Sequence, residues 1–391
     1  MKRTYIHLKT ISKVNLLTCF LFVFCVIGCS KEDGPMAQVK STEKKVTSFV
    51  FLLTNNPIDI NVVATIDETS KTITATMPRG TNVKGLLPEI KISAKATIDF
   101  DSARDFTNPV EYTITAEDGT KATYTVTIIA PLSDRQVLQA IIDANPGNTL
   151  GWDVENIVDL DLLDGVYYVN GHIVELEINT KNINVLPKEI GELKYLELLF
   201  MAGNPIAMLP SEIGDLTSLT NLTLTNNQLI SVPKKIGQLS KLEKLILYNN
   251  KLTSIPSEIG QLIALKEMNL GMNELTFLPK EIGKLDSLRF LYSEINQLTS
   301  LPVEIGELIN LEIVVLEDNK LSSIPIEMGL LTKMSVLNLK QNNLINVPQS
   351  VCDLRTFNGG ILRLLTDLGV GCNPTYSEAL TSWANVKVFG Y

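Results

Sequence analysis

Histidine is scarce in this chain, and its scarcity limits the catalytic chemistry that the chain can perform. The 391 residues include two histidines, His7 and His172, and five cysteines. A Ser-His-Asp triad, a Cys-His pair or a zinc site needs histidine or cysteine beside other reactive groups, and no such group surrounds His172. We therefore expect no enzyme, no metal and no cofactor. Because His172 follows an Asn-Gly turn signal, we expect its side chain to be solvated.

Long apolar runs and clusters of basic residues are also rare. The one long apolar run, VNLLTCFLFVFCVIG, follows Lys2, Arg3, Lys9 and Lys13. It is too short and wrongly flanked for a membrane-spanning helix, and it is typical of a secretory signal peptide. Removing it with its four basic residues takes the formal net charge from −9 to −13. An acidic chain without Lys/Arg clusters is not expected to bind nucleic acid or anionic lipid.

The apolar run ends in Val26-Ile27-Gly28-Cys29, which resembles the lipobox of bacterial lipoproteins. The resemblance implies that residues 1–28 are a signal peptide and that Cys29 carries lipid such as palmitate; an ordinary secretory signal is the alternative. The next residues, SKEDG, resemble the acidic tether that directs lipoproteins of some Gram-negative families to the outer face. We therefore expect an outer membrane lipoprotein exposed at the cell surface and attached by its lipid alone. Residues 29–42 are polar and predict a flexible stalk.

Two cysteines remain outside the signal region and Cys29. Cys352 and Cys372 lie 20 residues apart in a chain predicted to be exported. A disulfide between them would stabilise the fold by roughly 3 kcal/mol through loop-closure entropy. The alternative is a pair of buried thiols.

Residues 43–130 show the two-residue period of β-strands. The runs SFVFLL, KTITATMP, EIKISA, VEYTITA and TYTVTII are rich in β-branched and aromatic residues, and the last two flank an Asp118-Gly119 turn signal. Short strands at this spacing predict an all-β sandwich. The stretch FTNPVEYTITAEDGTKATYTVTI resembles the Ig-like domains that follow the stalk in Gram-negative surface lipoproteins. It contains no group of residues with site chemistry, so we interpret it as a spacer.

Residues 131–172 predict a cap made of one helix and one hairpin. Ser133 and Gln136 form an S-x-x-Q capping box ahead of an apolar helical stripe, and Asn170-Gly171 marks a hairpin turn. A helix and a hairpin in front of a repeat array would cover the exposed core of the first repeat.

Residues 173–354 hold about eight copies of a 23-residue repeat, and residues 355–391 form a predicted C-terminal cap. The consensus LxxLxxLxLxxNxLxxLPxEIGx resembles the leucine-rich repeat family. This implies an α/β-type solenoid with a curved parallel inner sheet and short 3-10 or helical outer segments. One asparagine recurs at each step of 23: Asn204, Asn227, Asn250, Asn273, Asn296, Asn319 and Asn342.

Each column of the repeat has a physical explanation. The leucines face inward and are covered only when copies stack. The asparagine lies where the chain turns inward, so its amide must satisfy backbone groups. Proline starts the outer segment by fixing φ, and the glycine of EIG is expected to end it by adopting φ > 0. These regular columns predict a scaffold, which leaves recognition to the irregular positions of the inner sheet.

The irregular positions form an apolar patch in the C-terminal half of the array. A cluster of aromatic and β-branched residues with a charged border is typical of a protein-binding surface, although the same residue types also favour strands for structural reasons. In the same repeat Ser293 replaces an inward leucine, which predicts a gap or a bound water. The predicted partner-binding residues are Phe290, Tyr292, Ile295, Ile313, Val315, Val336, Ile246, Tyr248, Glu294 and Glu317.

The resemblance favours a protein or peptide as the partner. A glycan is the alternative, because an Ig-like spacer on an exported lipoprotein is typical of carbohydrate uptake, but Trp152 and Trp383 lie in the end caps. A cell adhesin is a third possibility. Glu294 and Glu317 occupy adjacent strands as a glycosidase pair would, yet no deep cleft is expected around them. A calcium site there would lack a D-x-D-x-D-G loop.

Overall fold

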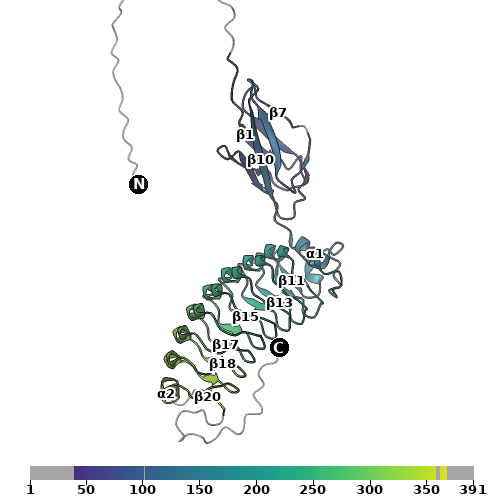
Figure 1. Ribbon diagram of the computed structural model, residues 1–391. Helices are drawn as coiled ribbons and strands as arrows, with labels where there is room; N and C mark the ends of the chain where they lie inside the picture. Colours follow the sequence, from purple (N-terminus) through teal and green to yellow (C-terminus); the bar gives the residue numbers. More distant parts are fainter. Residues whose placement is uncertain (1–38, 101, 358–361, 368–391) are drawn as a thin grey trace, which may run out of the picture.

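The computed structural model describes residues 39–100, 102–357 and 362–367, which form a β-domain followed by a curved solenoid (Figure 1). Cys29, Cys372 and the predicted signal peptide lie outside these ranges, so the predictions made for them remain predictions. Within the described ranges, no helix has both the length and the apolar character needed to cross a membrane.

The β-domain is a sandwich of short strands, as the two-residue period predicts. One sheet has the order β2-β1-β6, a second has the order β3-β4-β10-β9-β7, and β5 pairs with β8. The strands are β1 (Val46–Phe51), β2 (Val62–Val63), β3 (Thr65–Asp67), β4 (Thr72–Thr76), β5 (Lys84–Leu86), β6 (Pro88–Ile92), β7 (Thr97–Ile98), β8 (Arg104–Asp105), β9 (Val110–Thr115) and β10 (Lys121–Ile129).

Alternating residues of these strands build an aromatic core. Phe49 contacts Phe51 and Tyr112 edge-on, with ring centroids 5.5 and 5.6 Å apart, and Phe51 contacts Phe106 in the same way at 5.5 Å. All four rings are buried. The β9–β10 hairpin turns at Gly119, whose φ of 88° suits a residue without a side chain.

The predicted cap lies between the two parts of the chain. Helix α1 (Asp134–Ala144) begins with the complete Ser133–Gln136 capping box and buries Val137, Leu138 and Ile141. A 3-10 turn, η1 (Leu160–Leu162), leads to strand β11 (Val166–Val169), which pairs antiparallel with β12 (His172–Glu177) across the Asn170-Gly171 turn. This hairpin opens the solenoid sheet and covers its first edge.

The solenoid sheet has the order β11 to β20, and every pairing from β12 onward is parallel and in register at 23-residue steps, with a longer step before β20. Each repeat contributes one strand of three residues to the inner face (Figure 1). These strands are β13 (Leu198–Phe200), β14 (Asn221–Thr223), β15 (Lys244–Ile246), β16 (Glu267–Asn269), β17 (Phe290–Tyr292), β18 (Ile313–Val315), β19 (Val336–Asn338) and β20 (Arg363–Leu365).

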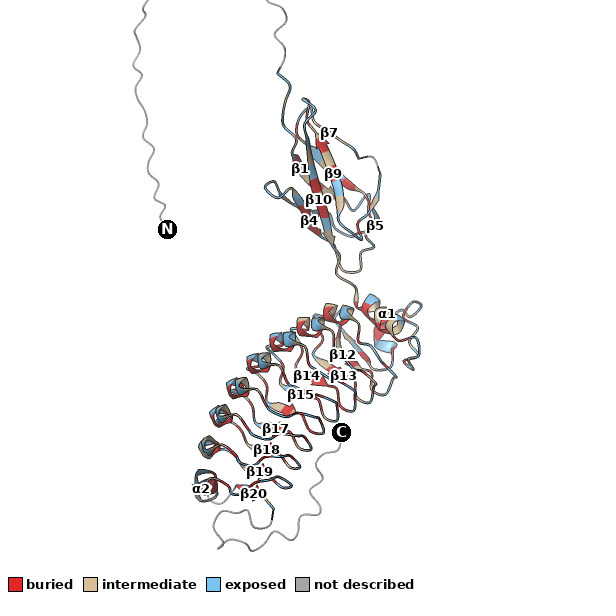
Figure 2. Cartoon of the chain, viewed as in Figure 1, coloured by how far each residue is buried: buried red, intermediate tan, exposed pale blue. Residues whose placement is uncertain are grey.

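The outer side consists of 3-10 turns that begin directly after the repeat proline, whose φ lies between −73° and −61°. Figure 2 shows that these turns expose their outer residues and bury the residues that face the strands. They are η2 (Lys188–Glu192), η3 (Ser211–Asp215), η4 (Lys234–Gln238), η5 (Ser257–Gln261), η6 (Lys280–Lys284), η7 (Val303–Glu307) and η8 (Ile326–Leu330).

The repeat glycines act differently from our prediction. None of them, from Gly191 to Gly329, has a positive φ. Their role is to allow close contact between turns. A Cβ at Gly214 would lie 2.2 Å from the carbonyl oxygen of Lys235, and a Cβ at Gly260 would lie 2.4 Å from that of Glu281. Glycine is therefore required because the next turn occupies the space of a side chain.

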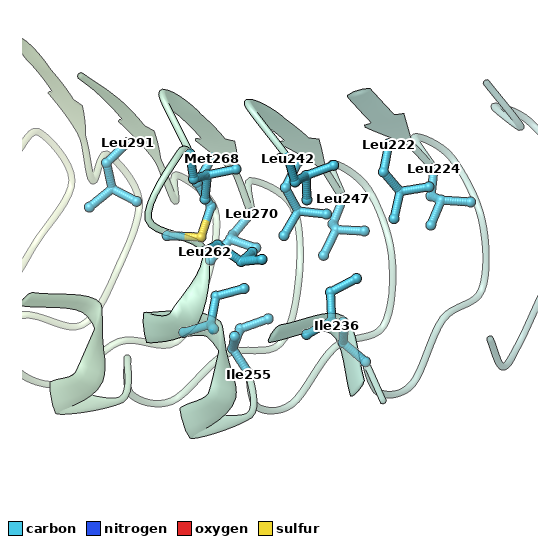
Figure 3. Packing of buried hydrophobic residues seen from close by; sticks show 14 of the residues in the cluster. Leu222, Leu224, Ile236, Leu242, Leu247, Ile255, Leu262, Met268, Leu270 and Leu291 are labelled. Atoms are coloured by element: carbon cyan, nitrogen blue, oxygen red, sulfur yellow. The ribbon is translucent and has the colours of Figure 1, made fainter. Parts of the chain in front are cut away.

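The core runs between the sheet and the 3-10 turns. Leu222 and Leu224 of one repeat pack beside Leu247 and Leu270 of the following repeats, and Ile236 closes the opposite side (Figure 3). All five are buried. Each repeat alone would leave this surface in water, so burial depends on the neighbouring copies.

The array continues further than its sequence pattern. Helix α2 (Gln349–Phe357) replaces the last 3-10 turn and packs against η8, and β20 adds a ninth parallel strand after β12 to β19. Asp367 accepts hydrogen bonds from the backbone N–H groups of Gln341 and Asn342 at 3.0 and 3.4 Å. Cys352 is buried on α2, and its predicted pairing with Cys372 remains a prediction.

Candidate functional site

The repeat asparagines tie neighbouring turns together. The Asn250 side chain donates to the carbonyl oxygens of Leu224 at 2.9 Å and Leu247 at 3.0 Å, and its Oδ1 accepts from the N–H of Leu229 at 3.0 Å. The same contacts recur at Asn273. Each amide thus satisfies backbone groups in its own repeat and in the repeat before it. This column is structural and leaves no amide available to a ligand.

The apolar patch is a continuous surface because the register places its residues side by side. Phe290 is paired with Ile313, and Ile313 with Val336, across β17, β18 and β19; Tyr292 is paired with Val315. These five side chains are half-buried, whereas the leucine or valine between them on each strand is fully buried. Parallel strands lie about 4.8 Å apart, so the five side chains touch one another along the concave face.

Ile295 borders this patch in a strained backbone conformation. Its φ is 54°, and it is 43% exposed. The corresponding residue of every repeat has a positive φ, and Asn226, Asn249 and Asp318 suit that conformation. A β-branched residue does not, and the left-handed region costs it about 1–2 kcal/mol. Thr180, at the start of the same column, is also β-branched and has a φ of 54°, so Ile295 is distinguished by its exposed apolar side chain beside the patch.

Ile246 and Tyr248, two of the predicted patch residues, differ from each other in solvent exposure. Ile246 is 1% exposed, so it belongs to the interior of the sheet face and is not available to a partner. The prediction is wrong because Ile246 is buried where it lies between its paired residues Thr223 on β14 and Asn269 on β16. Tyr248 is half-buried and remains part of the surface.

Glu294 is the most unusual charged residue of the concave face. Its carboxylate lies above Gly271, where an added Cβ would come 2.5 Å from Oε1 and 2.9 Å from the ring of Tyr248. The other oxygen, Oε2, is shielded from solvent and has no hydrogen-bond partner among the described residues. Burial raises the pKa of Glu294, and the negative charge of Glu317 adds to the rise. Burial and the Glu294 charge likewise raise the pKa of Tyr248.

Glu317 lies in the same column on the next repeat. Its Oε2 accepts a hydrogen bond from Asn338 at 2.7 Å. Neither Glu294 nor Glu317 forms an ion pair with a described lysine or arginine. By contrast, Lys244 pairs with Glu267 on the neighbouring strands at 3.3 Å, and Arg289 pairs with Glu312 at the edge of the sheet at 2.7 Å.

Ser293 is fully buried beneath the patch, between the buried Leu270 and Leu316. Its Oγ lies 3.4 Å from the Asn296 amide nitrogen, and its carbonyl oxygen accepts from Asn319 at 2.8 Å. The hydroxyl group thus joins the asparagine column.

Arg79, which the sequence pattern did not single out, lies at the junction between the β-domain and the cap. It pairs with Asp134 at 2.8 Å and donates to the carbonyl oxygens of Leu132 and Glu192 at 2.9 and 2.8 Å. His172 is half-buried there, with its ring stacked on Tyr195 at 3.8 Å and its Nδ1 3.4 Å from Arg79. The prediction of a solvated histidine is therefore wrong, because Tyr195 and Arg79 cover part of the ring.

A pocket of about 290 Å³ lies at this junction, lined by Arg79, Asp134, Tyr168 and His172 among others. Arg79 donates to backbone carbonyl oxygens and pairs with Asp134, and Arg135, which also lines the pocket, donates to the carbonyl oxygens of Val154 and Val158. Within the described ranges, no group of three or more His, Cys, Asp or Glu residues could hold a metal ion.

Comparison with known families divides the chain in the same way as the structure. Residues 46–128 match the family described as SGBP, N-terminal, and residues 172–275 match a leucine-rich repeat region. The comparison with curated proteins gives no match.

Several solved structures are similar to the solenoid. A leucine-rich repeat protein of Leptospira interrogans is 36% identical, with 49% of this chain and 54% of that chain covered and a TM-score of 0.44. An internalin of Listeria monocytogenes is 22% identical over 49% and 52%, with a TM-score of 0.40. The Arabidopsis receptor kinase HAESA, solved with the peptide hormone IDA and a co-receptor, is 24% identical over 60% and 41%, with a TM-score of 0.52.

The chain spans about half or less of the length of these structures, and the HAESA comparison supports the fold alone. The repeat columns, the parallel sheet and the two family matches agree on one assignment. The chain contains an array of leucine-rich repeats that follows an N-terminal all-β domain, and this domain matches the SGBP, N-terminal family.

Proposed function

We propose that this protein is a non-enzymatic binding protein that recognises a protein or peptide partner with the concave face of its solenoid. The observation that carries the proposal is the patch formed by Phe290, Tyr292, Ile313, Val315 and Val336, with the strained and exposed Ile295 at its border. Half-buried aromatic and β-branched side chains on a rigid sheet provide anchors at low entropic cost.

We also propose that the protein lies at the bacterial cell surface. The lipobox-like Val26-Ile27-Gly28-Cys29 supports attachment through lipid on Cys29, and the match of residues 46–128 to the SGBP, N-terminal family supports a surface-associated protein. The β-domain would then hold the solenoid away from the membrane.

A glycan is the second candidate ligand, and the same family match favours it. Tyr248, Phe290 and Tyr292 offer aromatic faces on the concave side, and sugar rings pack on such faces. Trp152 is distant from the patch, because it lies in the cap before β11 and donates to the carbonyl oxygen of Asp164 at 2.9 Å. Trp383 lies outside the described residues, and among the described residues the aromatic groups of the patch are tyrosine and phenylalanine.

One experiment separates the two ligand classes. The purified full chain is screened in parallel against a displayed library of random linear peptides and against a glycan array. We expect the peptide library to yield enriched peptides with a shared sequence pattern, and we expect the glycan array to show no saturable binding. Saturable binding to glycans without peptide enrichment would contradict it and support the second candidate.

A further inference from the structure

The concave face carries a negative charge that the fold itself does not neutralise. Glu294 and Glu317 occupy adjacent repeats, and both lack an ion pair within the described part of the chain, while Lys244–Glu267 and Arg289–Glu312 show that neighbouring repeats do form such pairs. A carboxylate removed from water without a compensating cation destabilises the folded state. Its presence at this position is therefore unexplained by stability.

The space around Glu294 is created by a missing side chain. The column that contains it reads Tyr248, Gly271, Glu294 and Glu317, and the bare backbone of Gly271 leaves room in which the Glu294 carboxylate and the Tyr248 ring both rest. Any larger residue at Gly271 would overlap Glu294 Oε1, since a Cβ alone would lie 2.5 Å away. The Glu294 carboxylate therefore lies beside the Tyr248 ring in space that a side chain at position 271 would fill.

Apolar groups flank this carboxylate on the strand and at the turn. Tyr292 lies at the end of β17, just before Glu294, and Tyr292 is paired with Val315 on β18. Ile295 follows Glu294 directly and is 43% exposed. A ligand group that reaches Glu294 must therefore bring apolar atoms beside it. This combination is complementary to an extended polypeptide with one cationic side chain between bulky apolar ones.

We propose that the partner segment is an extended peptide with an arginine or lysine that binds between Glu294 and Glu317. Apolar residues on either side of this cation would pack against the patch formed by Phe290, Tyr292, Ile313, Val315 and Val336. This inference rests on the proposed function. The cation would donate hydrogen bonds to both carboxylates, and its flat or alkyl part would lie on the Tyr248 ring. The net charge of −9 for the whole chain attracts such a segment at long range.

The test uses the displayed peptide library with the full chain and two amide variants. Glu294→Gln keeps the shape of the side chain and removes its charge, and Glu307→Gln makes the same change on the exposed outer turn η7. We expect the wild-type chain to enrich peptides with Arg or Lys beside apolar residues. Glu294→Gln should weaken their binding about tenfold or more, and Glu307→Gln should leave it unchanged.

A second measurement excludes a merely structural effect. Because Glu294 is desolvated and unpaired, Glu294→Gln should melt at the same temperature as the wild-type chain or at a higher one. A fall in melting temperature large enough to unfold the variant at the assay temperature would overturn the inference. Enrichment of peptides that lack basic residues would also overturn the inference, and so would an unchanged affinity of the Glu294→Gln variant. Either of these two results leaves the proposed function intact. Failure to enrich any peptide would contradict both proposals.

Discussion

At the scale of single residues, the asparagine column shows how a polar side chain can stabilise an apolar solenoid. The amide of Asn250 reaches two carbonyl oxygens and one N–H group, spread over its own repeat and the preceding one. Asn296 and Asn319 repeat the arrangement beneath the patch, where Ser293 supplies a backbone carbonyl oxygen and its Oγ lies 3.4 Å from the Asn296 amide nitrogen. A polar residue at Ser293 is thus tolerated, because asparagine groups lie within reach.

We predict that Asn250→Ala destabilises the protein by about 2 kcal/mol, because it leaves buried backbone groups of Leu224, Leu229 and Leu247 without partners. For a domain of this size the melting temperature should fall by roughly 4–8 °C in thermal unfolding followed by circular dichroism. Asn343→Ala, at the exposed position directly after the last asparagine of the column, serves as the control and should change stability by less than about 0.5 kcal/mol. Equal melting temperatures for both variants would contradict a structural role for the column.

Ile295 and Glu294 contrast with the asparagine column, whose side chains satisfy backbone groups of the solenoid. One is an exposed β-branched residue at φ 54°, and the other is a shielded carboxylate with an oxygen that no described group contacts. We expect both to lower the stability of the fold, and they occupy adjacent positions of one repeat. Local conflict of this kind in an otherwise regular array is expected where recognition, and not folding, determines the residue.

At the scale of elements, the regular features follow from the sequence with few exceptions. The 23-residue period fixes the parallel strands, and the repeat proline marks the start of each 3-10 turn from η2 to η8. The capping box of α1 and the hairpin turns at Gly119 and Gly171 were likewise predictable, because they depend on local backbone chemistry. These elements require no knowledge of distant contacts.

The exceptions all depend on contacts between elements. The repeat glycines were expected to adopt positive φ, but the carbonyl group of the next turn explains them, and no single repeat reveals that contact. Ile246 was placed on the surface by its position in the strand, although neighbouring side chains cover it. The short strands β2, β3, β5, β7 and β8 carry too few residues for a recognisable period.

The candidate site was predictable only in outline. Its apolar members could be read from the irregular positions of the repeat, because the register of the array is known from its period. The environment of Glu294 could not be predicted, since it depends on how Tyr248 and Glu294 share the space above Gly271. The break in the column at Gly271 is the one feature of the sequence that could have drawn attention to it.

At the scale of the whole molecule, the two parts of the chain meet in a defined joint. Arg79 reaches from the β-domain to the Asp134 carboxylate and the carbonyl oxygens of Leu132 and Glu192, and Asp134 in turn accepts from the N–H of Ile173 at 2.7 Å. The N–H of Gly80 donates to the carbonyl oxygen of Pro131 at 2.8 Å. A joint with these contacts favours one orientation of the solenoid relative to the β-domain.

We predict that Arg79→Ala loosens this joint without unfolding either part. Small-angle X-ray scattering should give a larger radius of gyration and a maximum dimension that spreads over several conformers, whereas the wild-type curve should fit one rigid shape. Lys91→Ala, at a largely exposed position on β6, is the control and should scatter like the wild-type chain. A wild-type curve that already requires several conformers, or an Arg79→Ala curve identical to it, would contradict a rigid joint.

We propose a division of roles in which the regular columns build the scaffold and the irregular concave positions bind the partner. Its most direct test compares Ile313→Lys/Val315→Lys on the concave sheet with Ile263→Lys/Ile309→Lys, whose exposed side chains lie on the segments that follow η5 and η7. Affinity for the peptides enriched by the wild-type chain is measured by isothermal titration calorimetry, together with each melting temperature.

We expect the concave pair to weaken binding by about tenfold or more, equivalent to 1.4 kcal/mol, because two charges would enter an apolar contact. The outer pair should leave affinity unchanged, and both variants should melt close to the wild-type temperature. Unchanged affinity in the concave pair, or equal loss in both pairs, would contradict the assignment of recognition to this face.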